Sequence, residues 1–129
     1  MGSRWLMIIS ALFLAGVGCF TLFAPDKVLG MHGTPPDNAT MLLIQMMGAL
    51  YLGFAALNWT ARGVMIGGIY ARPVAVGNLV HFTIVAAQLG KAAVKFGALP
   101  LFASATVYGA FALWFALVAF YVPVPKSER

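Results

Sequence analysis

The chain has 129 residues, of which 62% are hydrophobic and 9% are charged, and its mean hydropathy is +0.93. Soluble domains carry about 25% charged residues, so this composition excludes an ordinary soluble protein and predicts an integral membrane protein with a single domain, 1–129. The net charge of +5 comes from eight basic and three acidic residues. Because the basic residues lie between and beside apolar segments, they indicate membrane topology and contacts with anionic lipid headgroups rather than binding to nucleic acid.

The first apolar segment covers residues 5–23 and is preceded by Arg4. A cleaved signal peptide is one interpretation, but the Ala-x-Ala cleavage pattern is missing near the end of the segment. We therefore expect a first transmembrane helix. Small residues recur in it every four positions and predict a face for close helix packing: Ala11, Ala15 and Cys19. Because Cys19 is the only cysteine, an intrachain disulfide and a CxxC redox pair are excluded.

Residues 24–40 form the longest polar interval and contain three of the seven prolines. Residues 25–30 are expected to form a short interfacial turn whose apolar side chains face lipid, namely Val28, Leu29 and Met31. The side chain of Asp37, Asn38 or Thr40 can cap the helix that follows. His32 is interpreted as a solvated loop residue, since no second metal ligand lies near it in the sequence, and no metal site is expected.

The second predicted span covers residues 41–59, and its polar residues suggest a packing face. Tyr51 and Asn58 are seven positions apart and therefore share one side of a helix, with Gly48 and Ala55 beside them. Ala49 and Gly53 form a small-xxx-small pair. Residues 60–72 are too short and too rich in glycine for another span, so they are expected to form an interfacial connection in which Met65, Ile66 and Ile69 contact lipid or the bundle.

The third predicted span, residues 73–94, carries the polar side chains Asn78, His81 and Gln88. They belong to a series whose members are spaced by three and four residues and so lie on one stripe of a helix: Asn78, His81, Val85, Gln88, Ala92 and Lys95. Gly97 and Pro100 mark the break before the fourth span, 100–121, which contains Tyr108. The predicted fold is therefore all-α, with four transmembrane helices in a bundle.

The distribution of basic residues predicts the orientation of the chain. Five lie on the side of the termini and three on the other: Arg4, Arg62, Arg72, Lys126 and Arg129 against Lys27, Lys91 and Lys95. By the positive-inside rule, both termini are expected to be cytoplasmic.

Two motifs in the first half of the chain suggest a family. They are LFAPDKVLG at residues 22–30 and MMGALYLGFAALNW at residues 46–59. In these segments the chain resembles the DUF4345 and DoxX-like family of small four-helix membrane proteins. The resemblance implies a four-helix bundle in a bacterial inner membrane and no assigned reaction. It also implies a link to redox complexes, because some DoxX relatives act as accessory subunits or in quinone-coupled sulfur oxidation.

The polar stripe of the third span allows two interpretations. Asn78, His81 and Gln88 can point into the bundle and form interhelical hydrogen bonds, which is sufficient reason for their presence. Alternatively, His81 lines a cavity and binds the polar head of a quinone or a lipid. The residues of that hypothetical ligand site are Asn78, His81, Gln88, Tyr51, Asn58 and Tyr108. Ligation of a haem or chlorophyll by His81 is disfavoured, because no second intramembrane histidine is present for bis-histidine haem.

Function is expected to be binding rather than catalysis. No acidic residue lies in any predicted span to orient His81 or hold a proton, so a hydrolase or a sterol isomerase is disfavoured and no enzyme activity is assigned. We expect an accessory or assembly subunit of a larger membrane complex, or a binder of a small lipophilic ligand. The partners are lipid and either other membrane subunits or further copies of the chain. The alternative is an oligomeric proton-coupled transporter in which His81 titrates.

Overall fold

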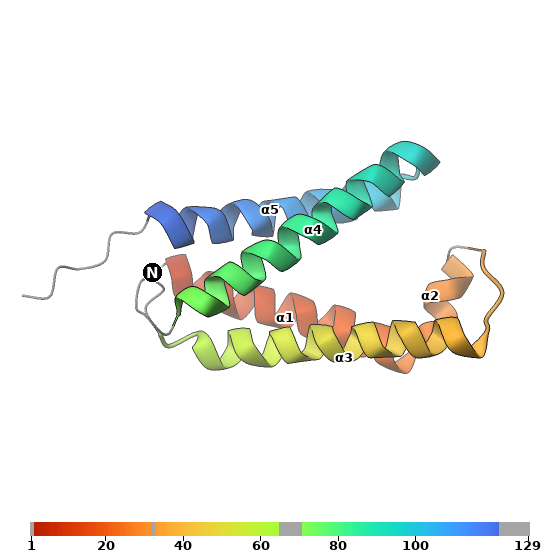
Figure 1. Ribbon diagram of the computed structural model, residues 1–129, viewed down its shortest axis with the longest axis horizontal. Coiled ribbons are helices and arrows are strands. Elements are labelled where there is room, and N and C mark those ends of the chain that lie inside the picture. Colours follow the sequence, from red (N-terminus) through yellow and green to blue (C-terminus); the bar gives the residue numbers. More distant parts are fainter. Residues whose placement is uncertain (1, 32, 65–70, 122–129) are drawn as a thin grey trace, which may run out of the picture. The chain divides into compact units, whose positions relative to one another are not determined.

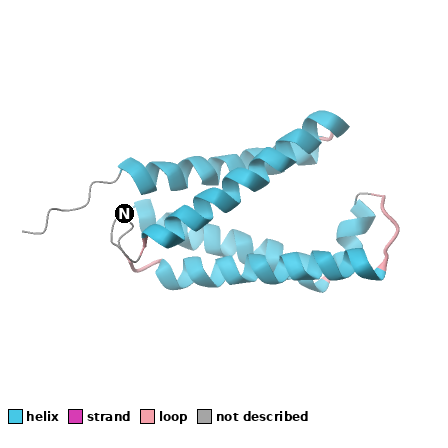
Figure 2. Cartoon of the chain, in the orientation of Figure 1, coloured by secondary structure: helices cyan, strands magenta, loops and turns pink. Residues whose placement is uncertain are grey.

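The computed structural model describes residues 2–31, 33–64 and 71–121, and within these ranges the chain forms five helices and no strand (Figure 1, Figure 2). The helices are α1 (Gly2–Phe23), α2 (Pro25–Met31), α3 (Asn38–Ala61), α4 (Arg72–Phe96) and α5 (Leu99–Tyr121). The predicted all-α class is confirmed. Among the described residues, four helices are long and apolar enough to cross a membrane: α1, α3, α4 and α5. The predictions for His32, Met65, Ile66, Ile69 and the C-terminal tail concern residues outside these ranges.

The helices begin earlier than the apolar segments from which they were predicted. The second span was predicted to start at residue 41, whereas α3 starts at Asn38 because Asp37 caps it. The Asp37 Oδ1 atom accepts a hydrogen bond from the backbone N–H of Thr40 at 2.9 Å. Hydrogen bonds from the Thr40 side chain and backbone lower the pKa of the Asp37 carboxyl, because they stabilise its charged form. Hydropathy detects only the apolar part of a helix, so a prediction based on it starts the helix after a polar first turn.

The short turn predicted at residues 25–30 is a helix, α2, of seven residues. Pro25 lies in its first position, where the absence of a proline N–H costs nothing. Leu29 is buried, so the prediction that it faces lipid is wrong, whereas Met31 is exposed. A side chain four positions after Pro25 lies on the same face of the helix, and both residues pack into the protein.

The chain divides into two compact units, one of residues Met7–Thr60 and one of Met1–Leu6 with Ala61–Arg129. The first unit holds α2, the part of α1 from Met7 onwards and nearly all of α3. The second holds α4 and α5. Each unit contains a pair of long helices.

In the first unit, α1 and α3 pack antiparallel and touch at two glycines. Ser10 hydrogen-bonds Asn58, and Leu22 near the other end of α1 accepts a hydrogen bond from Gln45, so the contacts run in opposite directions along the two helices. Between them, a Cβ atom added to Gly48 would lie 2.9 Å from the carbonyl oxygen of Gly18. Glycine at both positions therefore allows the two backbones to meet.

The predicted small-residue faces are only partly correct. Between Asn38 and Thr60, the buried residues of α3 are Gly48, Tyr51, Ala55 and Asn58, spaced by three and four as expected for the face of Tyr51 and Asn58. Ala49 and Gly53 are both exposed, so they do not form the contact. On α1, Ala11 is buried but Cys19 is exposed, and Gly18 takes the place predicted for Cys19.

In the second unit, α4 and α5 form a hairpin closed by Gly97. This residue has a φ angle of 62°, in the left-handed region that glycine adopts without strain, and its N–H donates to the Ala93 carbonyl at 2.8 Å. Gly97 ends α4 as predicted, whereas Pro100 lies in the first turn of α5. Between the helices, the ring centroid of Phe82 lies 4.8 Å from Phe111 and 5.6 Å from Phe115.

Candidate functional site

The six residues of the predicted ligand site belong to both units. Asn78, His81 and Gln88 lie on α4 and Tyr108 lies on α5, whereas Tyr51 and Asn58 lie on α3.

Asn78 is fully buried, and its amide bonds to its own helix. The Nδ2 atom donates to the backbone carbonyl oxygen of Val74 at 2.8 Å. A bond to the preceding turn satisfies a buried donor without a ligand. This contact supports the interpretation of Asn78 as a packing residue.

The imidazole of His81 is half-buried and lies among aromatic rings. Its ring centroid is 5.3 Å from that of Phe82, in an edge-on arrangement, and 6.3 Å from that of Tyr108. The structure thus brings His81 and Tyr108 near each other, as the predicted site required. However, Phe82, which the sequence analysis did not single out, is the fully buried residue at this level of the helix.

Gln88 is exposed and leaves the buried side of α4. On a helix of 3.6 residues per turn, ten positions from Asn78 turn Gln88 about 80° away from it. The buried face of α4 instead follows Ala75, Asn78, Phe82 and Ala93. The prediction that Asn78 and Gln88 share one face of α4 was therefore too broad, because residues spaced by three and four drift around the helix over ten positions.

On α3, Asn58 takes part in a buried polar contact with α1. Its Nδ2 atom donates to the hydroxyl oxygen of Ser10 at 3.0 Å, and that hydroxyl donates to the Met7 carbonyl at 3.2 Å. Both Ser10 and Asn58 are fully buried. Sequence reasoning missed Ser10, although a hydroxyl inside an apolar span is itself a signal of a polar contact between helices. Tyr51 is buried on the same face of α3.

The Ser10–Asn58 hydrogen bond is expected to couple the two side chains energetically. In a double-mutant cycle with Ser10→Ala and Asn58→Ala, the coupling free energy of unfolding should be about 0.6 kcal/mol and at most about 1.7 kcal/mol. Unfolding in detergent micelles measures it. Thr60→Val is the control, because the exposed Thr60 hydroxyl bonds to carbonyls of its own helix. Additive single effects would show that the contact contributes nothing.

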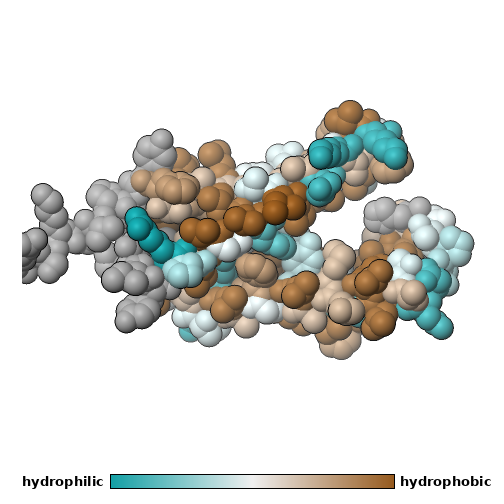
Figure 3. Space-filling view, viewed as in Figure 1, coloured by the Kyte–Doolittle hydropathy of each residue, from teal (hydrophilic) through white to brown (hydrophobic). Residues whose placement is uncertain are grey.

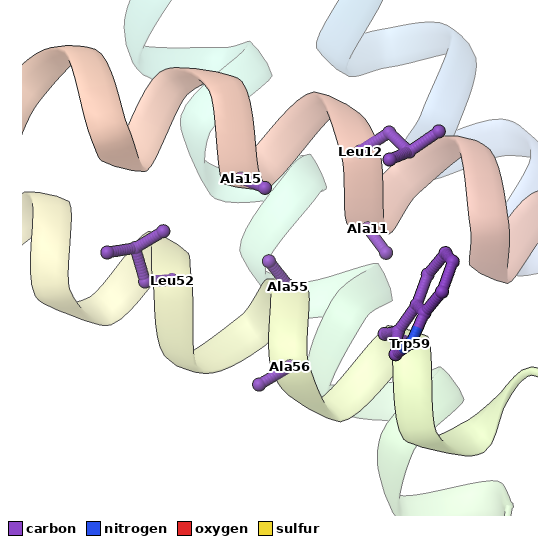
Figure 4. A pocket seen from close by; sticks show the side chains of 7 residues that line it. All are labelled: Ala11, Leu12, Ala15, Leu52, Ala55, Ala56 and Trp59. Atoms are coloured by element: carbon purple, nitrogen blue, oxygen red, sulfur yellow. The ribbon is translucent and has the colours of Figure 1, made fainter.

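A separate apolar groove lies between α1 and α3 (Figure 4). Its volume is about 380 Å³, and seven residues line it: Ala11, Leu12, Ala15, Leu52, Ala55, Ala56 and Trp59. The indole of Trp59 projects from α3 towards α1 beside Ala11. Leu12, Ala56 and Trp59 are exposed, so the groove opens at the surface of this hairpin. None of the residues predicted for ligand binding lines it.

Comparisons with known proteins add no assignment: no family model, no curated protein and no solved structure matches the chain. Among the described ranges, no group of three or more histidine, cysteine, aspartate or glutamate side chains could hold a metal ion. The groove and the polar contacts of the two hairpins are therefore the features that bear on function.

Proposed function

We propose that the protein is an accessory subunit of a larger membrane complex, and that the groove between α1 and α3 receives a transmembrane helix of another polypeptide. The observation that carries this proposal is the lining of the groove, in which four of the seven residues are alanines. In lipid, helices associate through van der Waals packing, and small residues allow their backbones to approach closely. Leu12 and Trp59 provide larger apolar surface beside the alanines.

The polar groups of α4 support a role without catalysis. The amide of Asn78 is bonded within its own helix, and the neighbours of His81 in the hairpin include Phe82 and Tyr108. No acidic residue occurs in α4 or α5 to exchange a proton with His81, which weighs against the transporter alternative. The resemblance to DoxX-like proteins favours the same role in a bacterial inner membrane. The distribution of basic residues favours cytoplasmic termini.

A second candidate occupant of the groove is a small lipophilic molecule such as a quinone or the acyl chain of a lipid. The volume of about 380 Å³ lies within the range of small-molecule sites, about 300–1,000 Å³. In this case the ligand would bind between α1 and α3 rather than at the polar stripe of α4.

Native mass spectrometry of the protein, extracted gently from its own membrane, tests both candidates. Ala56→Leu fills the groove from an exposed position, and Ala87→Leu adds the same bulk to an exposed position of α4. We expect a bound polypeptide that Ala56→Leu lowers at least tenfold and Ala87→Leu leaves unchanged. A penalty of about 1.4 kcal/mol is enough for that loss.

Other outcomes separate the candidates. A small molecule lost only from Ala56→Leu would replace the subunit proposal with the second candidate. A bound polypeptide that both variants retain, or that both lose, would remove the groove as the binding surface. Circular dichroism checks that both variants keep their helix content.

A further inference from the structure

The C-terminal third of α4 carries an exposed polar face that the proposed function does not use. Gln88, Lys91 and Lys95 are all exposed and are spaced by three and four residues, so they lie on one side of the helix. Exposed Ile84 continues the same face towards the middle of the span. In the space-filling view, a hydrophilic patch covers this end of α4 (Figure 3).

The two lysines of this face lack an acidic neighbour on their own hairpin. No aspartate or glutamate occurs in α4 or α5. Lysines four positions apart on a helix repel each other. By contrast, Lys27 on α2 lies 3.9 Å from the carboxylate of Asp26, and Asp37 caps α3. The face of Lys91 and Lys95 therefore carries positive charge that an anion would neutralise.

The order of groups along this face matches one class of ligand. From the middle of the span outwards, the face presents the apolar Ile84, the amide of Gln88 and then the two ammonium groups. An anionic phospholipid has the same order: an acyl chain, ester carbonyls and a phosphate. A rise of 1.5 Å per residue places Lys95 about 10 Å beyond Gln88, within the span of a lipid headgroup and its esters.

The end of the hairpin also has the mixed surface of a membrane interface. Val94, Phe96 and Leu99 are each more than two-thirds exposed, and the Lys95 Nζ atom lies 5.4 Å from the ring centroid of Phe96. Apolar side chains next to exposed ammonium groups are typical of the depth at which phosphates lie, where lysines extend to the headgroups.

We propose that Gln88, Lys91 and Lys95 form a binding site for the headgroup of an anionic phospholipid, with its acyl chain along Ile84. The site is on α4 and is independent of the groove between α1 and α3, so either proposal can fail alone.

Native mass spectrometry of the purified protein with added phosphatidylglycerol or phosphatidylcholine tests the site. A basic residue near an anionic membrane surface contributes about 1 kcal/mol, so Lys91→Gln and Lys95→Gln should each weaken phosphatidylglycerol binding about fivefold, and the double variant about 25-fold. Lys27→Gln is the control, because it removes one positive charge that Asp26 already compensates. It should change binding less than twofold.

Three results would overturn the site. They are equal binding of the two lipids by the unmodified protein, unchanged phosphatidylglycerol binding by the double variant, and a loss in Lys27→Gln as large as in Lys91→Gln. The last would show a response to net charge alone. Lys91 and Lys95 are exposed, so their replacement should leave folding intact, and circular dichroism verifies this.

Discussion

Replacing Gly48 with alanine is expected to destabilise the α1–α3 hairpin by about 1–3 kcal/mol, the usual cost of added bulk in a closely packed contact. A Cβ atom at this position would lie 2.8 Å from the Leu22 nitrogen and 2.9 Å from the Gly18 carbonyl oxygen. Both are backbone atoms, so no side-chain rotation can relieve the overlap and the helices must separate. Reversible unfolding in mixed detergent micelles measures the loss.

Alanine substitutions at two other glycines serve as controls and should not lower the free energy of unfolding. A Cβ atom added to Gly53 on α3, or to Gly16 on α1, would meet no atom within 4 Å beyond the adjacent residues and the backbone of its own helix. Alanine is favoured over glycine inside a helix by about 1 kcal/mol, so these variants should be neutral or slightly more stable. Gly18→Ala should be intermediate, because one of its three closest contacts is the side chain of Leu52, which can move. If Gly48→Ala and Gly53→Ala behave alike, the helices do not cross at Gly48.

Phe82→Ala should have the largest effect in the α4–α5 hairpin. Phe82 is fully buried and its ring stacks on Phe111 and Phe115. In soluble proteins such a change costs about 3–5 kcal/mol, part of which is the free energy of transferring the ring from water to the core. A ring in a lipid-embedded hairpin is already in apolar surroundings, so that part is absent. We therefore expect a loss of about 2–3 kcal/mol. The same unfolding measurement applies.

Phe120→Ala provides the matched control on α5, because 72% of the Phe120 side chain is exposed and its removal leaves no cavity. Its expected effect is below about 0.5 kcal/mol. Phe82→Leu should fall between wild type and Phe82→Ala, since leucine fills part of the volume. An equal loss in Phe82→Ala and Phe120→Ala would contradict a packed aromatic core between α4 and α5.

The spacing of the polar residues in the sequence predicted some of their positions in the structure and not others. The pattern correctly placed Tyr51 and Asn58 together on a buried face of α3, because seven residues are nearly two full turns. It could not identify Ser10 as the partner of Asn58, since a hydrogen bond between helices depends on their register. It also grouped Gln88 with Asn78, whereas small angular deviations add up along a helix until Gln88 is exposed.

The sequence by itself determined the membrane class, the four long apolar helices and the break at Gly97. These depend on local properties, namely the hydropathy of a segment and the conformational freedom of one glycine. Only the tertiary structure decided which small residues form the contact between α1 and α3. Gly18 and Gly48 form it, whereas Cys19 and Gly53 are exposed. Glycine, alanine and cysteine are all small enough for a close contact, so the choice among them depends on the register and crossing of two helices, which the sequence of neither helix contains.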